Sequence, residues 1–124
     1  MEVNNPGINI RMLTDDGRIV HKKIIPTGAW NMDTTAVITV AHGLAGLLWK
    51  NILSVMCYIS NNADTSRYPL NTGNDLADPG LSGGGIVGWT NTIVQMWRRT
   101  GGLFDDPTFN AAGGHSYIVI EYYE

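Results

Sequence analysis

The chain has 124 residues, a length typical of one domain, and its formal net charge is −3. Only 15% of its residues are charged, so the broad basic surface of a nucleic-acid binder is missing and we expect no nucleic-acid partner. No run approaches the roughly 20 apolar residues that cross a bilayer, so we expect no membrane insertion. The first residues lack the pattern of a signal peptide, which predicts synthesis in a cytoplasm. The single cysteine, Cys57, cannot form an internal disulfide, and its apolar neighbours predict a buried thiol.

The first 26 residues have the pattern of a β-hairpin. Residues 8–12 alternate apolar and polar, an Asp-Gly turn follows, and residues 18–25 supply the returning strand. Pro26 ends the hairpin because proline cannot donate a ladder hydrogen bond. We therefore assign residues 1–26 to an N-terminal hairpin arm that docks on a neighbour, and residues 27–124 to the main domain.

The main domain is rich in strand patterns separated by turn residues. The predicted strands are residues 36–41, 52–60, 67–70, 86–97 and 117–123. Together they predict an all-β, antiparallel domain. Between the first two, residues 44–50 are too short for a confident helix and predict a loop or a single turn. The segment 71–85 collects Asn, Asp, Pro, Ser and Gly, which predicts a long exposed loop that is either functional or mobile. Its last three residues, Gly83–Gly85, lack the lysine and helix of a phosphate-binding loop, which favours a hinge or a close-packing point.

No catalytic constellation is evident. The three histidines, His21, His42 and His115, do not lie in a nucleophile elbow or another recognised setting, so we expect no enzymatic activity. We expect His42 to bond a turn or a neighbouring subunit, and His115 to be a loop residue. Widely separated histidines and one thiol also lack the close pairs of a zinc site, so we predict no metal and no cofactor.

Charged residues in the loops have two readings each. The acidic residues could offer oxygen ligands to calcium, but without the ordered spacing of an EF-hand they are more typical of solvated turns. These are Asp75, Asp78, Asp105 and Asp106. The pair Arg98 and Arg99 could contact an anionic group such as sulfate or an acidic sugar, although a basic pair at a strand end more often forms surface ion pairs.

Four motifs resemble the distal domains of bacteriophage fibre proteins, over residues 26–124. They are residues 28–33 (GAWNMD), 40–44 (VAHGL), 99–105 (RTGGLFD) and 118–122 (IVIEY). The resemblance implies an H-type-lectin-like antiparallel β-sandwich, assembly as a homotrimer, and location in a virion made in the host cytoplasm. The chain starts at Met1 without a repetitive fibre shaft, which leaves open a short head fibre, a decoration protein or an excised fibre tip.

Aromatic residues beside the long loop are the best candidates for ligand binding. Saccharides are held by flat rings together with planar hydrogen-bonding groups, and Tyr68, Trp89 and Asn91, with Arg67, have the required chemistry. The alternative for each aromatic is packing in the core or at a subunit interface. We expect Trp30 to be structural, and Trp49 is a candidate for a subunit seam.

The function predicted from the sequence is that of a noncatalytic virion protein, of the fibre, head-fibre or capsid-decoration type, that binds a host-surface polysaccharide. Its expected partners are two further copies of itself, other virion proteins through the N-terminal arm, and the polysaccharide. Three weak sites at fixed spacing would gain avidity on a multivalent target. The alternatives are a purely structural capsid or tail adaptor, a cellular H-type-like lectin and, last, a hydrolase.

Overall fold

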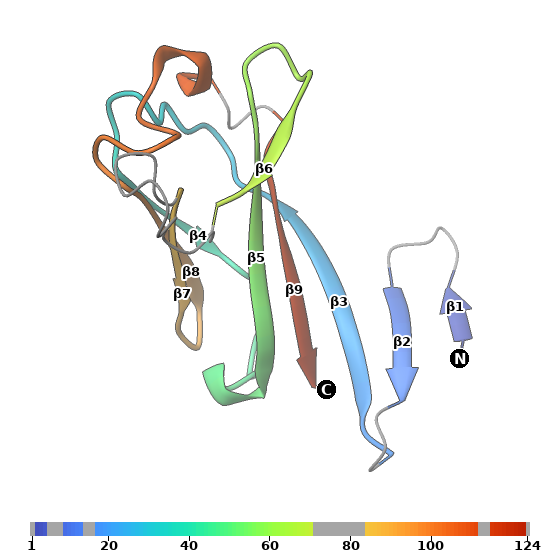
Figure 1. Ribbon diagram of the computed structural model, residues 1–124. Helices are drawn as coiled ribbons and strands as arrows, with labels where there is room; N and C mark the ends of the chain where they lie inside the picture. Colours follow the sequence, from blue (N-terminus) through green and yellow to red (C-terminus); the bar gives the residue numbers. More distant parts are fainter. Residues whose placement is uncertain (1, 5–8, 14–16, 71–83, 112–114, 124) are drawn as a thin grey trace, which may run out of the picture.

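The protein is all-β and consists of two antiparallel sheets packed face to face (Figure 1). The computed structural model describes residues 2–4, 9–13, 17–70, 84–111 and 115–123, with side chains described from residue 17 onward. The expected all-β sandwich is therefore observed. The predicted loop 71–85 falls outside the described residues up to position 83, as do Asp75 and Asp78.

The larger sheet has six strands in the order β1-β2-β3-β9-β5-β6. Their bounds are β1 Glu2–Asn4, β2 Asn9–Leu13, β3 Ile19–Pro26, β5 Ile52–Ser60, β6 Arg67–Pro69 and β9 Tyr117–Tyr123. β9 is central and pairs with β3 on one side and with β5 on the other. The chain thus brings its last strand between two strands that are far apart in sequence.

β3 belongs to the body of this sheet. It pairs with β9 without a break from Val20↔Tyr123 to Pro26↔Tyr117. β2 pairs with β3, and β1 adds a further short strand at the edge. The predicted turn at residues 14–17 lies outside the described residues except for Gly17. Figure 1 shows β1 and β2 at the end of the larger sheet remote from the smaller sheet. An arm that stands apart from the sandwich would therefore end before β3.

The smaller sheet has three strands in the order β4-β8-β7, with bounds β4 Val37–Ala41, β7 Gly85–Trp89 and β8 Ile93–Arg98. The sequence predicted one strand over residues 86–97, but a turn at residues 90–92 divides it into β7 and β8. The Thr90 hydroxyl accepts hydrogen bonds from the backbone N–H of Thr92 (3.3 Å) and Ile93 (3.2 Å), and the Thr90 N–H donates to the Ile93 carbonyl (2.9 Å). A threonine side chain can satisfy a turn in this way without glycine or proline.

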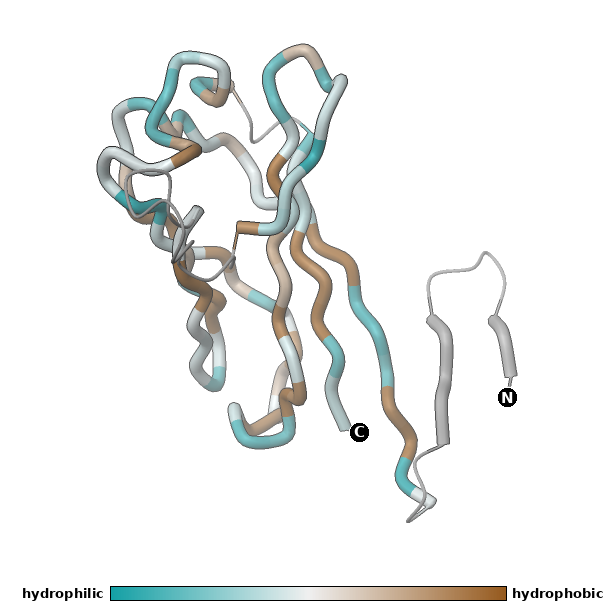
Figure 2. Tube along the Cα trace, in the orientation of Figure 1, coloured by the Kyte–Doolittle hydropathy of each residue, from teal (hydrophilic) through white to brown (hydrophobic). Residues whose placement is uncertain are grey.

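Alternation along the strands places the core between the two sheets. Every second residue is buried in β8, in β5 from Val55 to Ile59, and in β9 at Ile118 and Ile120. Figure 2 shows apolar residues along β5 and β9, whereas β3 has polar residues between its apolar ends. The Cys57 side chain is fully buried, as predicted.

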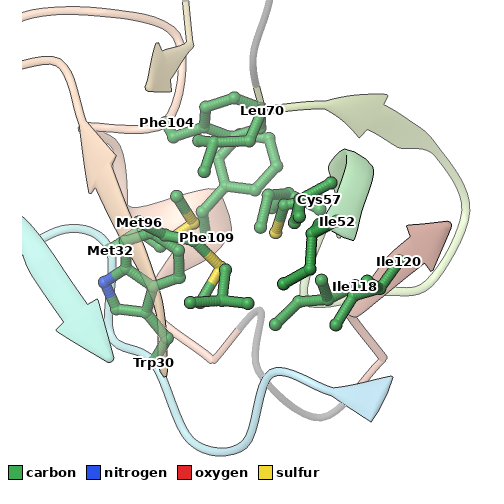
Figure 3. Close-up of a cluster of buried hydrophobic side chains, with 13 residues drawn as sticks. Trp30, Met32, Ile52, Cys57, Leu70, Met96, Phe104, Phe109, Ile118 and Ile120 are labelled. Carbon is green, nitrogen blue, oxygen red and sulfur yellow. The ribbon is translucent and has the colours of Figure 1, made fainter. Parts of the chain in front are cut away.

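Two loops complete this core with large side chains (Figure 3). Trp30 and Met32 come from the segment before β4, and Phe104 and Phe109 come from the segment after β8; their exposed fractions are 3%, 0%, 0% and 5%. The Met32 N–H donates to the Phe109 carbonyl (3.2 Å), which ties the two loops together. The Trp30 indole N–H donates to the Thr35 carbonyl (2.8 Å). Trp30 is therefore structural, as expected.

Gly84 and Gly85 are close-packing points. A Cβ on Gly84 would lie 2.7 Å from the Leu70 carbonyl oxygen, and one on Gly85 would lie 2.9 Å from the Trp97 carbonyl carbon and still closer to its oxygen. Real Cβ atoms do not approach backbone atoms this closely. Of the two roles expected from the sequence for this glycine run, the structure supports close packing at these two positions.

Candidate functional site

The sandwich has two ends with different contents. One end carries the β5–β6 loop, the start of β9 and the 3-10 helix η3 (Pro107–Phe109); the other carries the 3-10 helix η1 (Trp49–Asn51) and the β7–β8 turn (Figure 1). We refer to these as the β5–β6 end and the η1 end. The sequence predicted a loop or single turn where η1 lies, and η1 is a single turn.

The predicted glycan residues are divided between these two ends. Arg67 and Tyr68 lie in β6, and the Tyr68 ring makes edge contacts with Phe104 (6.4 Å between centroids) and Phe109 (6.2 Å). Tyr68 is 38% exposed, so one edge packs on the core and the remainder faces solvent. The structure shows its packing on the core, and its role in glycan binding stays a prediction.

Trp89 and Asn91 lie at the η1 end. The Trp89 indole N–H donates to the Trp49 carbonyl (3.0 Å), and the Asn91 amide oxygen accepts from the Trp49 N–H (2.7 Å). Trp89 also packs on the core. Since Gly85 abuts Leu70 just after β6, and Trp89 lies four residues further along β7, Trp89 is roughly 13 Å beyond that contact. Within one chain, Tyr68 and Trp89 do not form one patch.

Arg98 is an interior residue, 8% exposed. Its guanidinium donates to the Met32 carbonyl and to the Thr100 hydroxyl (3.3 Å), and lies 3.4 Å from the Asp105 carboxylate. Asp105 also accepts from the Gly101 N–H (2.8 Å). Arg98 and Asp105 thus fix the loop after β8, and the anionic contact predicted for the pair would fall to Arg99, whose side chain is exposed.

Asp106 also has a structural role. Its carboxylate accepts from the Thr108 N–H (2.9 Å) and caps η3. The hydrogen bond from the Thr108 hydroxyl lowers the pKa of Asp106 most, and the bond from the Thr108 N–H lowers it further. Both hydrogen bonds stabilise the ionised form of the Asp106 carboxylate.

His42 is buried and joins three segments. Its Nδ1 accepts from the Leu44 N–H (3.1 Å), so the proton is on Nε2, which donates to the Thr90 carbonyl (3.1 Å). The Lys23 ammonium donates to the His42 carbonyl (2.8 Å). His42 therefore bonds a turn within its own chain, which is one of the two roles expected for it.

A polar hollow lies beside Arg67 at the β5–β6 end. Its volume is about 280 Å³, and Ser60, Asp64, Thr65, Ser66 and Arg67 line it. We call it the β5–β6 hollow. Its lining is dominated by hydrogen-bonding groups.

The loop that forms the hollow is held firmly. The Asn61 amide oxygen accepts from the N–H groups of Thr65 (2.8 Å) and Ser66 (3.3 Å), which is the behaviour of an asparagine that organises a turn. Asn62 fastens the loop to the η3 segment, because its amide donates to the Pro107 carbonyl (2.9 Å) and to Asn110 (2.8 Å). The hollow is therefore preformed.

Asp64 is the central charge of the hollow. It has a φ of 53°, a left-handed conformation that aspartate tolerates better than most residues. The Ser60 hydroxyl donates to its carboxylate (2.7 Å), and Arg67 and His115 lie 3.8 Å and 3.7 Å from it. The Ser60 hydrogen bond lowers the pKa of Asp64; partial desolvation opposes the change, while His115 and Arg67 support it. Asp64 is therefore an anion at neutral pH.

Aromatic rings continue from the hollow onto the outer face of the larger sheet. The Arg67 guanidinium lies 5.0 Å from the centre of the Tyr117 ring, which in turn lies 5.3 Å from the Tyr58 ring. The hollow and its surroundings thus combine an acceptor, planar donors and flat rings. Hydroxyl-rich ligands use these groups.

The Ser60, His115 and Asp64 side chains do not form a hydrolytic triad. Ser60 is 1% exposed and donates to Asp64, whereas His115 contacts Asp64 from the other side. A serine nucleophile needs a base that accepts its proton and an open approach to substrate. The geometry suits binding.

Sequence reasoning found Arg67 but missed Asp64, Ser60 and His115 as members of a site. The residues 61–64 were recognised as a turn, and His115 as a loop residue. Their proximity depends on the pairing Tyr58↔Tyr117, which joins β5 to β9. No local pattern reveals such a distant pairing.

Among the described residues, no helix has the length and apolar character needed to span a membrane, and no group of three potential His, Cys, Asp or Glu metal ligands is found. No protein-family model, curated protein or solved structure matched the chain.

Proposed function

We propose that the chain is a noncatalytic virion protein of the fibre, head-fibre or decoration type, built on an H-type-lectin-like plan, that assembles as a homotrimer and binds a host-surface glycan. The observation that carries the binding half is the β5–β6 hollow, whose preformed loop presents Asp64 and Arg67, with His115 contacting Asp64 from the segment before β9. The phage and trimer parts rest on the sequence resemblance and on the two-sheet architecture.

The ligand class follows from the chemistry of the hollow. An ionised Asp64 accepts hydrogen bonds from two adjacent sugar hydroxyls, and Arg67 donates to ring or hydroxyl oxygens. The negative charge of Asp64 would repel a strongly anionic ligand, so a neutral hexose or amino-sugar unit fits better. A hollow that is shallow and half exposed gives a weak single site, and three copies would supply avidity.

A glycan array tests the proposal. Binding of the unchanged chain is expected, and Arg67→Leu and Asp64→Asn should each weaken single-site binding by about 10-fold to 150-fold, the loss of one hydrogen bond to a charged group. Asparagine also accepts a positive φ, so Asp64→Asn should keep the loop. Arg99→Leu removes an exposed arginine outside the hollow and is the matched control, which should bind as the unchanged chain does. Weaker binding by Arg99→Leu would instead support the anionic contact predicted from the sequence.

If both hollow variants bind as strongly as the unchanged chain, the glycan site is not the hollow, and the Tyr68 and Trp89 surfaces are the next candidates. An array without signal would favour the purely structural adaptor. The edge position of β1 favours that second function, since an edge strand can accept a strand from another protein. The test of this adaptor function is deletion of residues 1–13, which removes β1 and β2 but leaves β3 in the sandwich.

A further inference from the structure

The η1 end has the densest group of exposed apolar side chains in the described part of the chain. Eight large hydrophobic residues are exposed in the described part of the chain, and three of them lie within six positions at this end: Leu48 at 46%, Trp49 at 56% and Leu53 at 42%. Single exposed hydrophobic residues are common, but a contiguous group is typical of an interaction surface. We call these three residues the η1 knob.

The backbone of Trp49 is held by hydrogen bonds, although its side chain is exposed. Its N–H donates to Asn91 (2.7 Å), and its carbonyl accepts from Trp89 (3.0 Å) as well as from the N–H of Ile52. Three hydrogen bonds therefore fix the backbone from which the indole projects. Binding through such a residue loses little backbone conformational entropy, and tryptophan is enriched among interface hot spots.

An apolar hollow lies beside the knob. Its volume is about 230 Å³, and residues 41–46 line it together with Asn91 and Thr92. Both ring nitrogens of His42 are already bonded, to Leu44 and Thr90, so this wall offers no unsatisfied polar group from the imidazole. A cavity of about 150 Å³ accepts benzene, so this hollow has room for much of an indole ring.

Asn91 lies between the two features, since it bonds the Trp49 backbone and also lines the hollow, whereas Trp49 itself does not line it. The knob and the hollow are therefore separate, neighbouring surfaces of one chain. We propose that the Trp49 knob of one copy inserts into the apolar hollow of a neighbouring copy, so that identical subunits meet around an axis at their η1 ends. A contact between two different patches is heterologous, and it closes into a ring when the rotation permits. This inference rests on the proposed homotrimer and specifies its contact.

Two variants remove opposite halves of the contact. Trp49→Asp places a charge on the knob while leaving the backbone hydrogen bonds, and Ala45→Phe fills the hollow from an exposed position whose φ is not in the left-handed region. Mass photometry should show a trimer for the unchanged chain. Each variant should raise the concentration needed for half-assembly at least about 30-fold, as expected for an interface hot spot.

Mixing the two variants gives the sharpest readout. Trp49→Asp retains an intact hollow and Ala45→Phe retains an intact knob, so the mixture should form a one-to-one complex that neither variant forms alone. Ile86→Asp, at a residue 67% exposed on β7, is the matched control and should remain trimeric. Thermal melting of each variant checks that the fold is kept.

The outcomes separate this contact from the proposed function. A monomeric unchanged chain would overturn the homotrimer itself. A trimeric Trp49→Asp variant would overturn the contact and leave the homotrimer standing, and loss of trimer only in Ile86→Asp would place the interface on the smaller sheet. Failure of the mixed variants to associate would overturn the pairing of knob with hollow. Glycan binding at the opposite end should persist in the monomeric variants at single-site strength.

Discussion

Gly85→Ala should destabilise the domain by about 3 kcal/mol. The added Cβ would lie 2.9 Å from the Trp97 carbonyl carbon, closer still to its oxygen, and 3.0 Å from a methyl group of Leu70. The obstructing atoms are backbone atoms of the paired strand β8, which cannot rotate away as a flexible side chain can. Relief requires β7 and β8 to separate locally.

The magnitude combines two effects. Overpacking in a close-packed region costs about 1 to 3 kcal/mol, and each ladder hydrogen bond that is weakened between Gly85 and Arg98 costs about 1 kcal/mol. Alanine has less conformational entropy than glycine in the unfolded chain, and this offsets about 0.4 to 1 kcal/mol of the destabilisation. Since 1 kcal/mol shifts the melting temperature of a domain of this size by about 3 to 5 °C, the expected decrease is about 10 to 15 °C.

Gly88→Ala, in the same strand, is the control. Its Cβ would meet the Trp97 ring at 3.4 Å and 3.6 Å, ordinary contact distances, so we expect a change below about 1 kcal/mol. Thermal unfolding monitored by tryptophan fluorescence measures both variants. If the melting temperature of Gly85→Ala lies within about 2 °C of that of Gly88→Ala, close packing is not the reason for glycine at position 85.

Two further predictions concern titratable groups. Burial raises the pKa of the Cys57 thiol to about 12, so a thiol reagent at pH 8 should label the native protein only at its rate of unfolding; rapid labelling without denaturant would contradict the burial of this residue. The pKa of Asp64 is lowered in the folded state from 3.8, so the stability that this carboxylate contributes is present above that value and is lost as the pH falls below it. The melting temperatures of the unchanged chain and Asp64→Asn should therefore differ at neutral pH and converge in strong acid, and a constant difference down to about pH 2 would show that the carboxylate is not stabilised by folding.

Most strands were predictable because alternation is a local property. The predicted segments 36–41, 52–60, 67–70 and 117–123 each correspond to a strand in the structure. The turn at residues 90–92 was missed, since its stabilising group is a threonine hydroxyl and the sequence there continues to favour β structure. Which strands pair, and that β3 is part of the sandwich, could not be derived locally because the pairing with β9 spans almost the whole chain.

The core was less predictable than the strands. Trp30, Met32, Phe104 and Phe109 are among its buried members, but all four lie outside the strands, three in loops and Phe109 in η3, where no period-2 pattern indicates which side chain points inward. The candidate site has the same difficulty. Arg67 could be selected from residue type, whereas Asp64 and His115 acquire their roles only after the β5–β6 loop and the start of β9 have been brought together.

The separation of the two hollows has a consequence for how the proposed assembly would work. β5 runs from Ile52, next to η1, to Ser60, in the wall of the β5–β6 hollow. Eight steps along a strand cover about 27 Å. Subunits joined at their η1 ends would therefore leave the three β5–β6 hollows outside the interface, at the far ends of the sandwiches. Assembly would then leave the glycan site of each subunit unchanged, because β5 holds the β5–β6 hollow at a fixed distance from the η1 end. Assembly would strengthen glycan binding only through avidity.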